Sequence, residues 1–350
     1  MAKDTWKEIT TQPDAWKRVL KRADGLAALI ENEDLRGPDP VFIGCGSSFY
    51  LALSAASMYS HMVGTRARAL TASDSLFYPE FLSGTDGRPP AFLISRSGKT
   101  TEMLWALDSI RNLHRMSTCA VSCRPRSDLV KQCDHAIVLP EGDEKSVVMT
   151  RSFTCMLLAV QVAAMHRGRV SLEGIHRLPE KGRVVVKRSD GLAEEIITGH
   201  DFAKFVFIGQ GPFYGLACES MLKIKEMALF ASEAYHSLEF RHGPISMADS
   251  SMLVTCFLSE RGRQEELNLL GEVRALGART LVVCEKADTG IRAVSDHILD
   301  LDSGLPEFHR LVLGLPVTQL MAYHAARKKG LDPDHPRNLN QVVEIRKGNG

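Results

Sequence analysis

The sequence predicts an α/β protein built from two copies of one doubly wound domain. In each copy, helices are expected on both faces of a mainly parallel, flavodoxin-like sheet. Short apolar runs alternate with helical stretches at the spacing that is typical of such a sheet. The alternation then repeats: Phe42-Ile-Gly-x-Gly in the first half returns as Phe207-Ile-Gly-x-Gly, and four strands align at an offset of about 162 to 165 residues.

The composition describes an ordinary soluble protein with a sizeable core. The chain has 350 residues, more than one average domain, and it is 44% apolar with a net charge of +1. This near-neutral balance gives no reason to expect a nucleic acid or an acidic surface as partner. No apolar stretch approaches the roughly 20 residues that a membrane-spanning helix needs, so we expect no membrane association.

The eight cysteines favour a reducing, cytoplasmic environment. Most of them lie in apolar runs and no secretory leader precedes them, which is typical of buried thiols. Cys119, Cys123 and Cys133 lie close together in the sequence, but no fourth ligand follows at a spacing typical of zinc. We therefore expect neither a metal ion nor another cofactor.

The first copy follows a helical leader. Residues 1–37 are polar with scattered apolar positions, which predicts one or two amphipathic helices broken near Pro13. The first domain is expected over residues 38–185. Its strands are expected to start at Val41 and to cover 91–94, 119–122 and 136–139, with helices over about 101–113 and 152–165.

The second copy is expected over residues 200–330. Residues 167–200 read as a charge-rich connector with a weak helical pattern, and the boundary is placed near 185–200. Phe49-Tyr-Leu-Ala returns as Phe213-Tyr-Gly-Leu-Ala, which suggests one inserted glycine. The remaining predictions are strands at 205–208, 253–258, 281–284 and from about 296, a looser helix over 308–329, and an irregular tail over 331–350. The family resemblance described below implies that this tail contributes to the active site.

The segment from Phe205 to Asp249 holds the residues best suited to proton transfer. Glu219, Lys223 and Glu226 lie at i, i+4 and i+7 of a predicted helix, so two carboxylates and an ammonium share one face. Gly243-Pro244 ends the pattern and leaves His242 in a turn. Carboxylate, amine and imidazole together can move protons between carbon and oxygen or nitrogen. An ordinary solvated ion pair and a structural histidine are the alternative.

A phosphate site is predicted at Ser95-Arg-Ser-Gly-Lys-Thr100. The stretch follows a strand and opens a helix, so backbone N–H groups and the positive end of the helix face one point. It lacks the first glycine of a P-loop, which argues for a monophosphate without magnesium or nucleotide. A hydroxyl-rich helix cap is the alternative. The Gly-x-Gly turns do not predict a dinucleotide site, because both lack the third glycine and the later acidic residue.

These motifs resemble the sugar isomerase (SIS) domain family. The likeness is carried by the paired halves, the 95–100 loop, Glu219-x-x-Leu-Lys-x-Lys-Glu226 and Glu239-x-x-His-Gly-Pro244. It is strongest to the isomerase half of glucosamine-6-phosphate synthase and its relatives without a glutaminase domain. Those relatives include type II glucosamine-6-phosphate deaminases, AgaS-type deaminase/isomerases and fructoselysine-6-phosphate deglycases. Lys7-Glu-Ile-x-x-Gln-Pro13 and Asp334-x-Pro-Arg-Asn-Leu339 extend the likeness to nearly the whole chain.

The resemblance implies a role for each matching residue. Glu226 would shuttle a proton between C1 and C2 through an enediol or enolamine, with Lys223 assisting. His242 would assist ring opening, and in the family it reaches the active site of the neighbouring subunit. The remaining positions are implied to bind substrate, the first five of them around the phosphate: Ser48, Ser95, Arg96, Ser97, Thr100, Thr150, Gly46, Glu219 and Gln341.

One departure from the synthase bears on the reaction. The synthase forms an imine with the ketose through a tail lysine, and the matching residue here is Gln341, whose amide cannot do so. The resemblance therefore implies a cytoplasmic homodimer that isomerises a phosphorylated amino sugar or ketose, with release of ammonia from an amino sugar. The alternatives are a simple ketose/aldose isomerase of the tagatose-6-phosphate type and a non-catalytic sugar-phosphate sensor. A sensor would not need Glu226 and His242 together.

Overall fold

The structure, a computed structural model, describes residues 3–82, 89–114 and 116–345. These residues form two compact units, and each contains one of the two sequence repeats. The first-repeat unit comprises Ala15–Glu173 together with the tail from Asn340. The second-repeat unit comprises the chain up to Asp14 together with Gly174–Leu339. The end of the predicted tail, residues 346–350, lies outside the described residues.

Each unit contains a five-stranded, entirely parallel sheet. The strand order is β2-β1-β3-β4-β5 in the first and β7-β6-β8-β9-β10 in the second, so the two copies share one topology. The predicted fold class is therefore confirmed. The strands of the first sheet are β1 (Val41–Gly44), β2 (Arg68–Thr71), β3 (Ala91–Ile94), β4 (Thr118–Ser122) and β5 (His135–Val138). Those of the second are β6 (Lys204–Gly209), β7 (Ser232–Tyr235), β8 (Met252–Phe257), β9 (Arg279–Cys284) and β10 (His297–Asp300).

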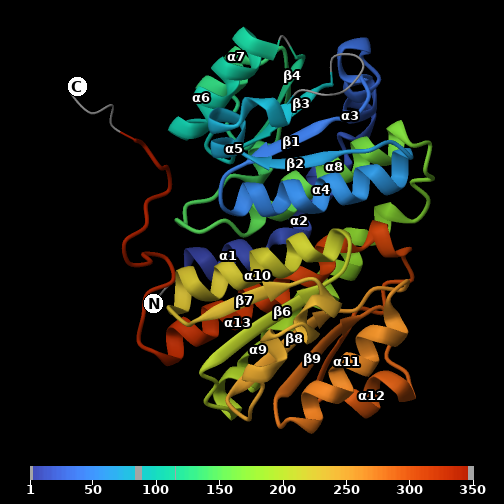
Figure 1. Cartoon of the computed structure of the whole chain (residues 1–350), viewed down its shortest axis with the longest axis vertical. Helices are drawn as coiled ribbons and strands as arrows, with labels where there is room; N and C mark the ends of the chain where they lie inside the picture. Colours follow the sequence, from blue (N-terminus) through green and yellow to red (C-terminus); the bar gives the residue numbers. More distant parts are fainter. Residues whose placement is uncertain (1–2, 83–88, 115, 346–350) are drawn as a thin grey trace. The chain divides into compact units, whose positions relative to one another are not determined.

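Helices cover both faces of each sheet (Figure 1). In the first-repeat unit they are α3 (Ala23–Ile30), α4 (Ser47–Val63), α5 (Ala72–Phe77), α6 (Thr101–Ser109), α7 (Asp128–Gln132) and α8 (Arg151–Arg167), while α2 (Gln12–Leu20) spans the boundary between the units. In the second-repeat unit they are α1 (Asp4–Thr10), α9 (Leu178–Gly199), α10 (Pro212–Ala228), α11 (Arg263–Ala275), α12 (Thr289–Val294) and α13 (Leu315–Lys328).

The central strands have few polar residues because both of their faces are covered. Every residue of β1, β3, β4 and β8 is buried. One face of the first sheet packs on α6 through Met103 and Leu107, and the same face of the second packs on α11 through Leu270 and Val273. Such continuous apolar runs are the signal that identified these strands in the sequence.

The sequence analysis missed the edge strands β2 and β7. Each has four residues and only one neighbouring strand, β1 and β6 respectively. Their sequences, Arg68-Ala-Leu-Thr and Ser232-Glu-Ala-Tyr, are partly exposed, so they lack the apolar run of a central strand. Parallel pairing with the buried neighbour, rather than local propensity, holds them in the sheet.

Two helical regions also differ from the sequence expectation. The N-terminal segment forms three helices rather than one or two, and Pro13 lies in the first turn of α2, where its missing N–H costs nothing. The expected weak connector contains α9, a helix of 22 residues that buries Val185, Ile196 and Ile197. Since α9 belongs to the second-repeat unit, the main segment of that unit begins at Gly174. The domain bounds given in the sequence analysis stay predictions.

The two copies align at the Gly-x-Gly turn without an inserted glycine. Gly46 and Gly211 both have positive φ, at 54° and 58°, and each precedes a helix of 17 residues. The Ser48 N–H donates to the Cys45 carbonyl, and the Phe213 N–H donates to the Gln210 carbonyl. Ser48 is therefore equivalent to Phe213, and the sequence alignment that placed Phe49 there was wrong.

Candidate functional site

The three residues predicted to transfer protons lie on α10, so the helix that their spacing predicted is confirmed. Gly211 at positive φ turns the chain after β6, and Pro212 begins the helix. The side chains of Glu219 and Lys223 are fully buried, and 18% of the Glu226 side chain is exposed. Lys223 Nζ lies 3.3 Å from Glu219 Oε1 and donates a hydrogen bond to Glu226 Oε2. The solvated surface pair, which was the alternative, is excluded for Lys223.

Opposing effects act on the pKa of Lys223. Burial by itself lowers the pKa, because a low-dielectric interior penalises the ammonium. The charges of Glu219 and Glu226 and their hydrogen bonds act in the opposite direction and hold the pKa above its ordinary value. Lys223 is therefore an ammonium at neutral pH. It connects a buried carboxylate to Glu226, which reaches the surface of this unit.

His242 follows a short 3-10 helix, Ser237–Arg241, and is exposed. Its N–H donates to the Glu239 carbonyl, and Gly243 continues the turn at φ 119°. The turn position that the sequence predicted is thus confirmed, and the role of the imidazole stays a prediction. A second histidine, His236, stacks on Tyr214 of α10 at 3.8 Å between ring centroids, and burial lowers its pKa.

The 95–100 loop is a compact turn between β3 and α6. The Gly98 N–H donates to Ser95 Oγ at 3.1 Å, and the Lys99 N–H donates to Ser97 Oγ at 3.2 Å. Gly98 has a φ of 59°, and a Cβ on it would lie 2.2 Å from Ser127 Oγ, so only glycine fits. The residue that caps α6 is Thr100, whose side chain makes no capping hydrogen bond. The hydroxyl-cap alternative therefore does not describe Thr100.

The Gly44–Ser48 turn lies at the carboxyl end of β1, next to the 95–100 loop at the end of the neighbouring strand β3. This is the point where the strand order reverses, and open parallel sheets commonly bind ligands there. The backbone approaches itself closely, since a Cβ on Gly44 would lie 2.3 Å from the Ser48 carbonyl. Ser48 is buried, and its Oγ lies 3.9 Å from Met149 Sδ.

The Arg96 side chain is buried, and its guanidinium is hydrogen-bonded to the protein's own backbone. Its guanidinium donates to the carbonyls of Ser146, Val147, Val148 and Gln341, at 2.8 to 3.3 Å. Its Nη1 also lies 3.6 Å from the carboxylate of Glu144. The side chain predicted to bind phosphate is thus engaged with its own chain.

Thr150 and Gln341 are held in the same region. The Thr150 N–H and hydroxyl donate to Glu144 Oε1 at 2.8 and 2.6 Å. The Gln341 amide nitrogen donates to the carbonyls of Glu144 and Ser146, at 2.9 and 3.3 Å, and its oxygen accepts from Arg124 at 2.9 Å. Further along the tail, the Thr101 N–H at the start of α6 donates to the Val343 carbonyl.

The predicted residues are divided between the two units. One group lies in the first-repeat unit and comprises Gly46, Ser48, Ser95, Arg96, Ser97, Thr100, Thr150 and Gln341. The other lies in the second-repeat unit and comprises Glu219, Lys223, Glu226 and His242. The sequence analysis missed Glu144 and Arg124. The signal for Glu144 was a carboxylate a few residues before a helix, which is easily taken for surface charge.

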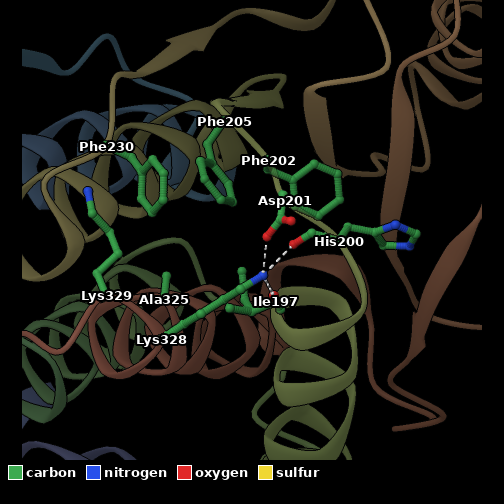
Figure 2. A pocket seen from close by; sticks show the side chains of 9 residues that line it. All are labelled: Ile197, His200, Asp201, Phe202, Phe205, Phe230, Ala325, Lys328 and Lys329. Carbon is green, nitrogen blue, oxygen red and sulfur yellow. Dashed lines mark hydrogen bonds and ion pairs between the residues drawn. The ribbon is translucent and has the colours of Figure 1, made fainter.

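A separate cavity of about 320 Å³ lies in the second-repeat unit, next to the amino ends of β6 and β7. Figure 2 shows it lined by Phe202, Phe205 and Phe230, with Lys328 on its floor. Lys328 Nζ donates to the carbonyls of Ile197 and His200 and to Asp201 Oδ1, so it caps the end of α9. None of the predicted site residues lines this cavity.

Comparison with known proteins places the chain in a family. Residues 40–166 and 201–328 match the SIS domain, and the chain belongs to the SIS domain family. It is 28% identical over 343 residues to a glutamine--fructose-6-phosphate aminotransferase [isomerizing] from Methanothermobacter thermautotrophicus, covering 97% of this chain. The chain spans only 57% of that relative's length.

Two solved structures cover the whole length of the fold. The glucosamine-6-phosphate deaminase of Thermotoga maritima is 29% identical with a TM-score of 0.80, covering 98% of this chain and 100% of that one. A Clostridium novyi protein provisionally assigned as a tagatose-6-phosphate ketose/aldose isomerase is 26% identical with a TM-score of 0.86, covering 98% and 94%. Within the described residues, no helix is both long and apolar enough to cross a membrane.

Proposed function

We propose that this protein isomerises an amino-sugar 6-phosphate and releases its nitrogen as ammonia. The observation that carries the proposal is the buried Lys223 ammonium, held between the fully buried Glu219 and the partly exposed Glu226. A fixed ammonium beside a carboxylate that reaches solvent suits a group that accepts and returns a proton. The family membership and the likeness to the Thermotoga maritima deaminase support the choice of substrate class.

The proposed reaction needs only proton transfers and water. After ring opening, Glu226 takes the proton from C2 of the aldose and leaves an enolamine. Return of a proton to C1 gives an imine at C2, and addition of water to this imine gives the ketose phosphate and ammonia. Phosphate recognition falls to the 95–100 loop and Ser48. His242 assists ring opening, and the dimer in which it serves a neighbouring subunit is part of the proposal.

Gln341 bears on which reaction the site favours. Its amide is bonded to two carbonyls and to Arg124, and it has no amine with which to form an imine with a ketose. This supports ammonia release over nitrogen transfer onto a ketose. Simple aldose–ketose isomerisation of a hexose 6-phosphate is the second candidate, because the same Glu226 chemistry performs it without an amino group.

A substrate panel with one variant tests the proposal. We expect the full chain to release ammonia from an amino-sugar 6-phosphate and to incorporate solvent deuterium at C1 of the product, as followed by NMR. Glu226→Gln keeps the shape but cannot accept the proton, so turnover should fall by roughly 10² to 10⁴-fold while binding persists. The control is Glu194→Gln, an exposed glutamate on α9, and it should change neither.

Three outcomes would contradict parts of the proposal. Normal turnover by Glu226→Gln removes Glu226 as the base. Isomerisation of ketose phosphates without ammonia release from any amino sugar favours the simple isomerase. Binding of a sugar phosphate without deuterium exchange or conversion shows a sensor rather than an enzyme.

A further inference from the structure

Most of the N–H donors of the Arg96 guanidinium are hydrogen-bonded to the protein's own backbone. An arginine has five N–H donors, and four of those of Arg96 are directed at the carbonyls of Ser146, Val147, Val148 and Gln341. The side chain is only 5% exposed. A phosphate that took these donors would break the hydrogen bonds of Arg96 to four backbone carbonyls, which costs free energy for each lost bond.

Glu144 is the anionic half of the same arrangement. Its side chain is fully buried, and it accepts hydrogen bonds from the N–H groups of Thr150 and Arg151 and from the hydroxyls of Thr150 and Ser152. These donors form the start of α8, so the carboxylate caps that helix. The 3.6 Å ion pair with Arg96 then neutralises both charges inside the unit.

Together the two side chains tie the loop after β3 to three other segments. Arg96 holds the carbonyls of residues 146–148, Glu144 holds the start of α8 at residues 150–152, and Gln341 of the tail is bonded to both parts. We call residues 146–150 the 146–150 wall, and Ser48 contacts it through Met149. The position of the 146–150 wall beside the predicted phosphate residues therefore depends on the Arg96–Glu144 link.

The second repeat also joins the loop after β8 to the segment after β10. Glu260 is equivalent to Arg96, because each follows the serine that accepts a hydrogen bond from a glycine N–H, at Ser259 and Ser95 respectively. Glu260 pairs with Arg310 at 2.7 Å, and Arg310 also donates to the Leu305 carbonyl at 2.6 Å in the segment after β10. The Glu260 carboxylate is 61% exposed, and the buried Glu307 accepts a hydrogen bond from the Glu260 N–H at 2.6 Å, so a buried carboxylate helps to join the two segments in this copy as well.

From these observations we propose that Arg96 and Glu144 are positioning residues, and that Arg96 shapes the phosphate site without itself neutralising the phosphate. The proposal refines the function proposed above and rests on it for the identity of the ligand. In this proposal hydroxyls and backbone N–H groups bind the phosphate, and the guanidinium of Arg96 does not. The two explanations predict opposite effects for several variants.

The first experiment measures binding of glucosamine 6-phosphate to the full chain by calorimetry. Lysine keeps the positive charge but cannot bond four carbonyls, so Arg96→Lys should lose affinity about as much as Arg96→Ala, roughly tenfold or more. Glu144→Ala removes a negative charge and should nevertheless weaken binding. The double variant Arg96→Ala/Glu144→Ala should be no worse than either single variant, because one link is lost in all three. Arg126→Lys, an exposed arginine nearby, is the control.

Affinity retained within about twofold by Arg96→Lys, or tightened by Glu144→Ala, would overturn the proposal and assign the charge of Arg96 to the phosphate. The second experiment needs no ligand. Amide hydrogen exchange of residues 146–152 should accelerate in Arg96→Ala and in Glu144→Ala, with circular dichroism checking that both are folded. Unchanged exchange in both variants would also overturn the proposal. If the unmodified chain binds no sugar phosphate, the proposed function fails, and the exchange measurement still decides whether the link positions residues 146–152.

Discussion

Removing the buried ammonium of Lys223 should destabilise the second-repeat unit severely. In Lys223→Met, the fully buried Glu219 carboxylate loses the partner that lies 3.3 Å away. Breaking a buried ion pair by removing one partner typically costs about 3 to 5 kcal/mol, because a buried charge is left without compensation. Glu226 contributes less to this cost, since 18% of its side chain already reaches solvent. For a unit of this size the unfolding transition should fall on the order of 10 °C.

The double variant Glu219→Gln/Lys223→Met distinguishes the lost charge partner from lost packing. It keeps the shape of both side chains and removes the buried charge, so it should recover more than half of the free energy of unfolding that Lys223→Met loses. Lys225→Met, an exposed lysine on the same helix, should stay within about 0.5 kcal/mol of the unmodified chain. Urea and thermal unfolding of the full chain, followed by circular dichroism, measure all three. A loss below about 1 kcal/mol in Lys223→Met, or no recovery in the double variant, would refute the reasoning.

The same argument fixes the dependence on pH. In the unmodified chain the folded-state pKa of Lys223 is raised, so its stabilisation is complete below the unfolded value of about 10.4 and is lost as pH rises through the folded value. In Lys223→Met, burial without a cation should raise the pKa of Glu219 in the folded state. The destabilisation of Lys223→Met is then absent below the unfolded-state pKa of a glutamate, about 4.3, and it grows as the pH rises above that value. The difference in stability between the two proteins should therefore shrink on acidification.

Two further predictions concern the phosphate loop and the assembly. Gly98→Ala should weaken sugar-phosphate binding measured by calorimetry, because its Cβ would lie 2.2 Å from Ser127 Oγ at a φ of 59°; Gly25→Ala, in α3 with nothing within 4 Å of the new Cβ, should leave binding unchanged. Mixing Glu226→Gln chains with His242→Ala chains should restore turnover in hybrid dimers if His242 acts in a neighbouring subunit; full activity in a demonstrated monomer would contradict this.

The sequence predicted those parts of the fold in which a single short segment carries its own signal. Central strands such as β3 and β8 were found because every residue is buried, and α10 because Glu219, Lys223 and Glu226 follow the helical period. The edge strand β7 was missed because its four residues are mostly part-exposed and its place depends on pairing with β6. The bounds of α9 were missed because Gly182 and Gly191 weaken the local pattern, whereas burial of one face stabilises the helix.

The local structure around the candidate site residues was predictable from the sequence, and their hydrogen-bond partners were less so. The loop at Ser95–Thr100 and the turn at His242 were read from spacing and from glycine positions. The bonds of Arg96 were not, because its acceptors are carbonyls 50 or more residues away, and a carbonyl leaves no mark on the sequence. Glu144 was missed for a similar reason, because its role depends on four hydrogen bonds that it accepts from the start of α8, and the sequence does not show these bonds.

The two repeats differ at the positions that are predicted to bind phosphate in the first copy. In the second copy the positions of Ser48, Ser97 and Thr100 are taken by Phe213, Arg261 and Gln264. The N–H and hydroxyl of Ser259 are already bonded to the buried carboxylate of Glu266, both at 2.8 Å, and an incoming anion would have to displace that carboxylate.

On the helix that follows the first strand of each copy, α4 or α10, the second copy holds the predicted residues and the first copy does not. The positions in α4 equivalent to Glu219, Lys223 and Glu226 are Ser54, Met58 and His61, which contain neither carboxylate nor ammonium. The two copies therefore share one strand topology but carry different sets of the predicted side chains. Because the hydroxyls and the carboxylates are divided between the copies, neither repeat alone holds a complete set, and the proposed activity requires both repeats in one chain.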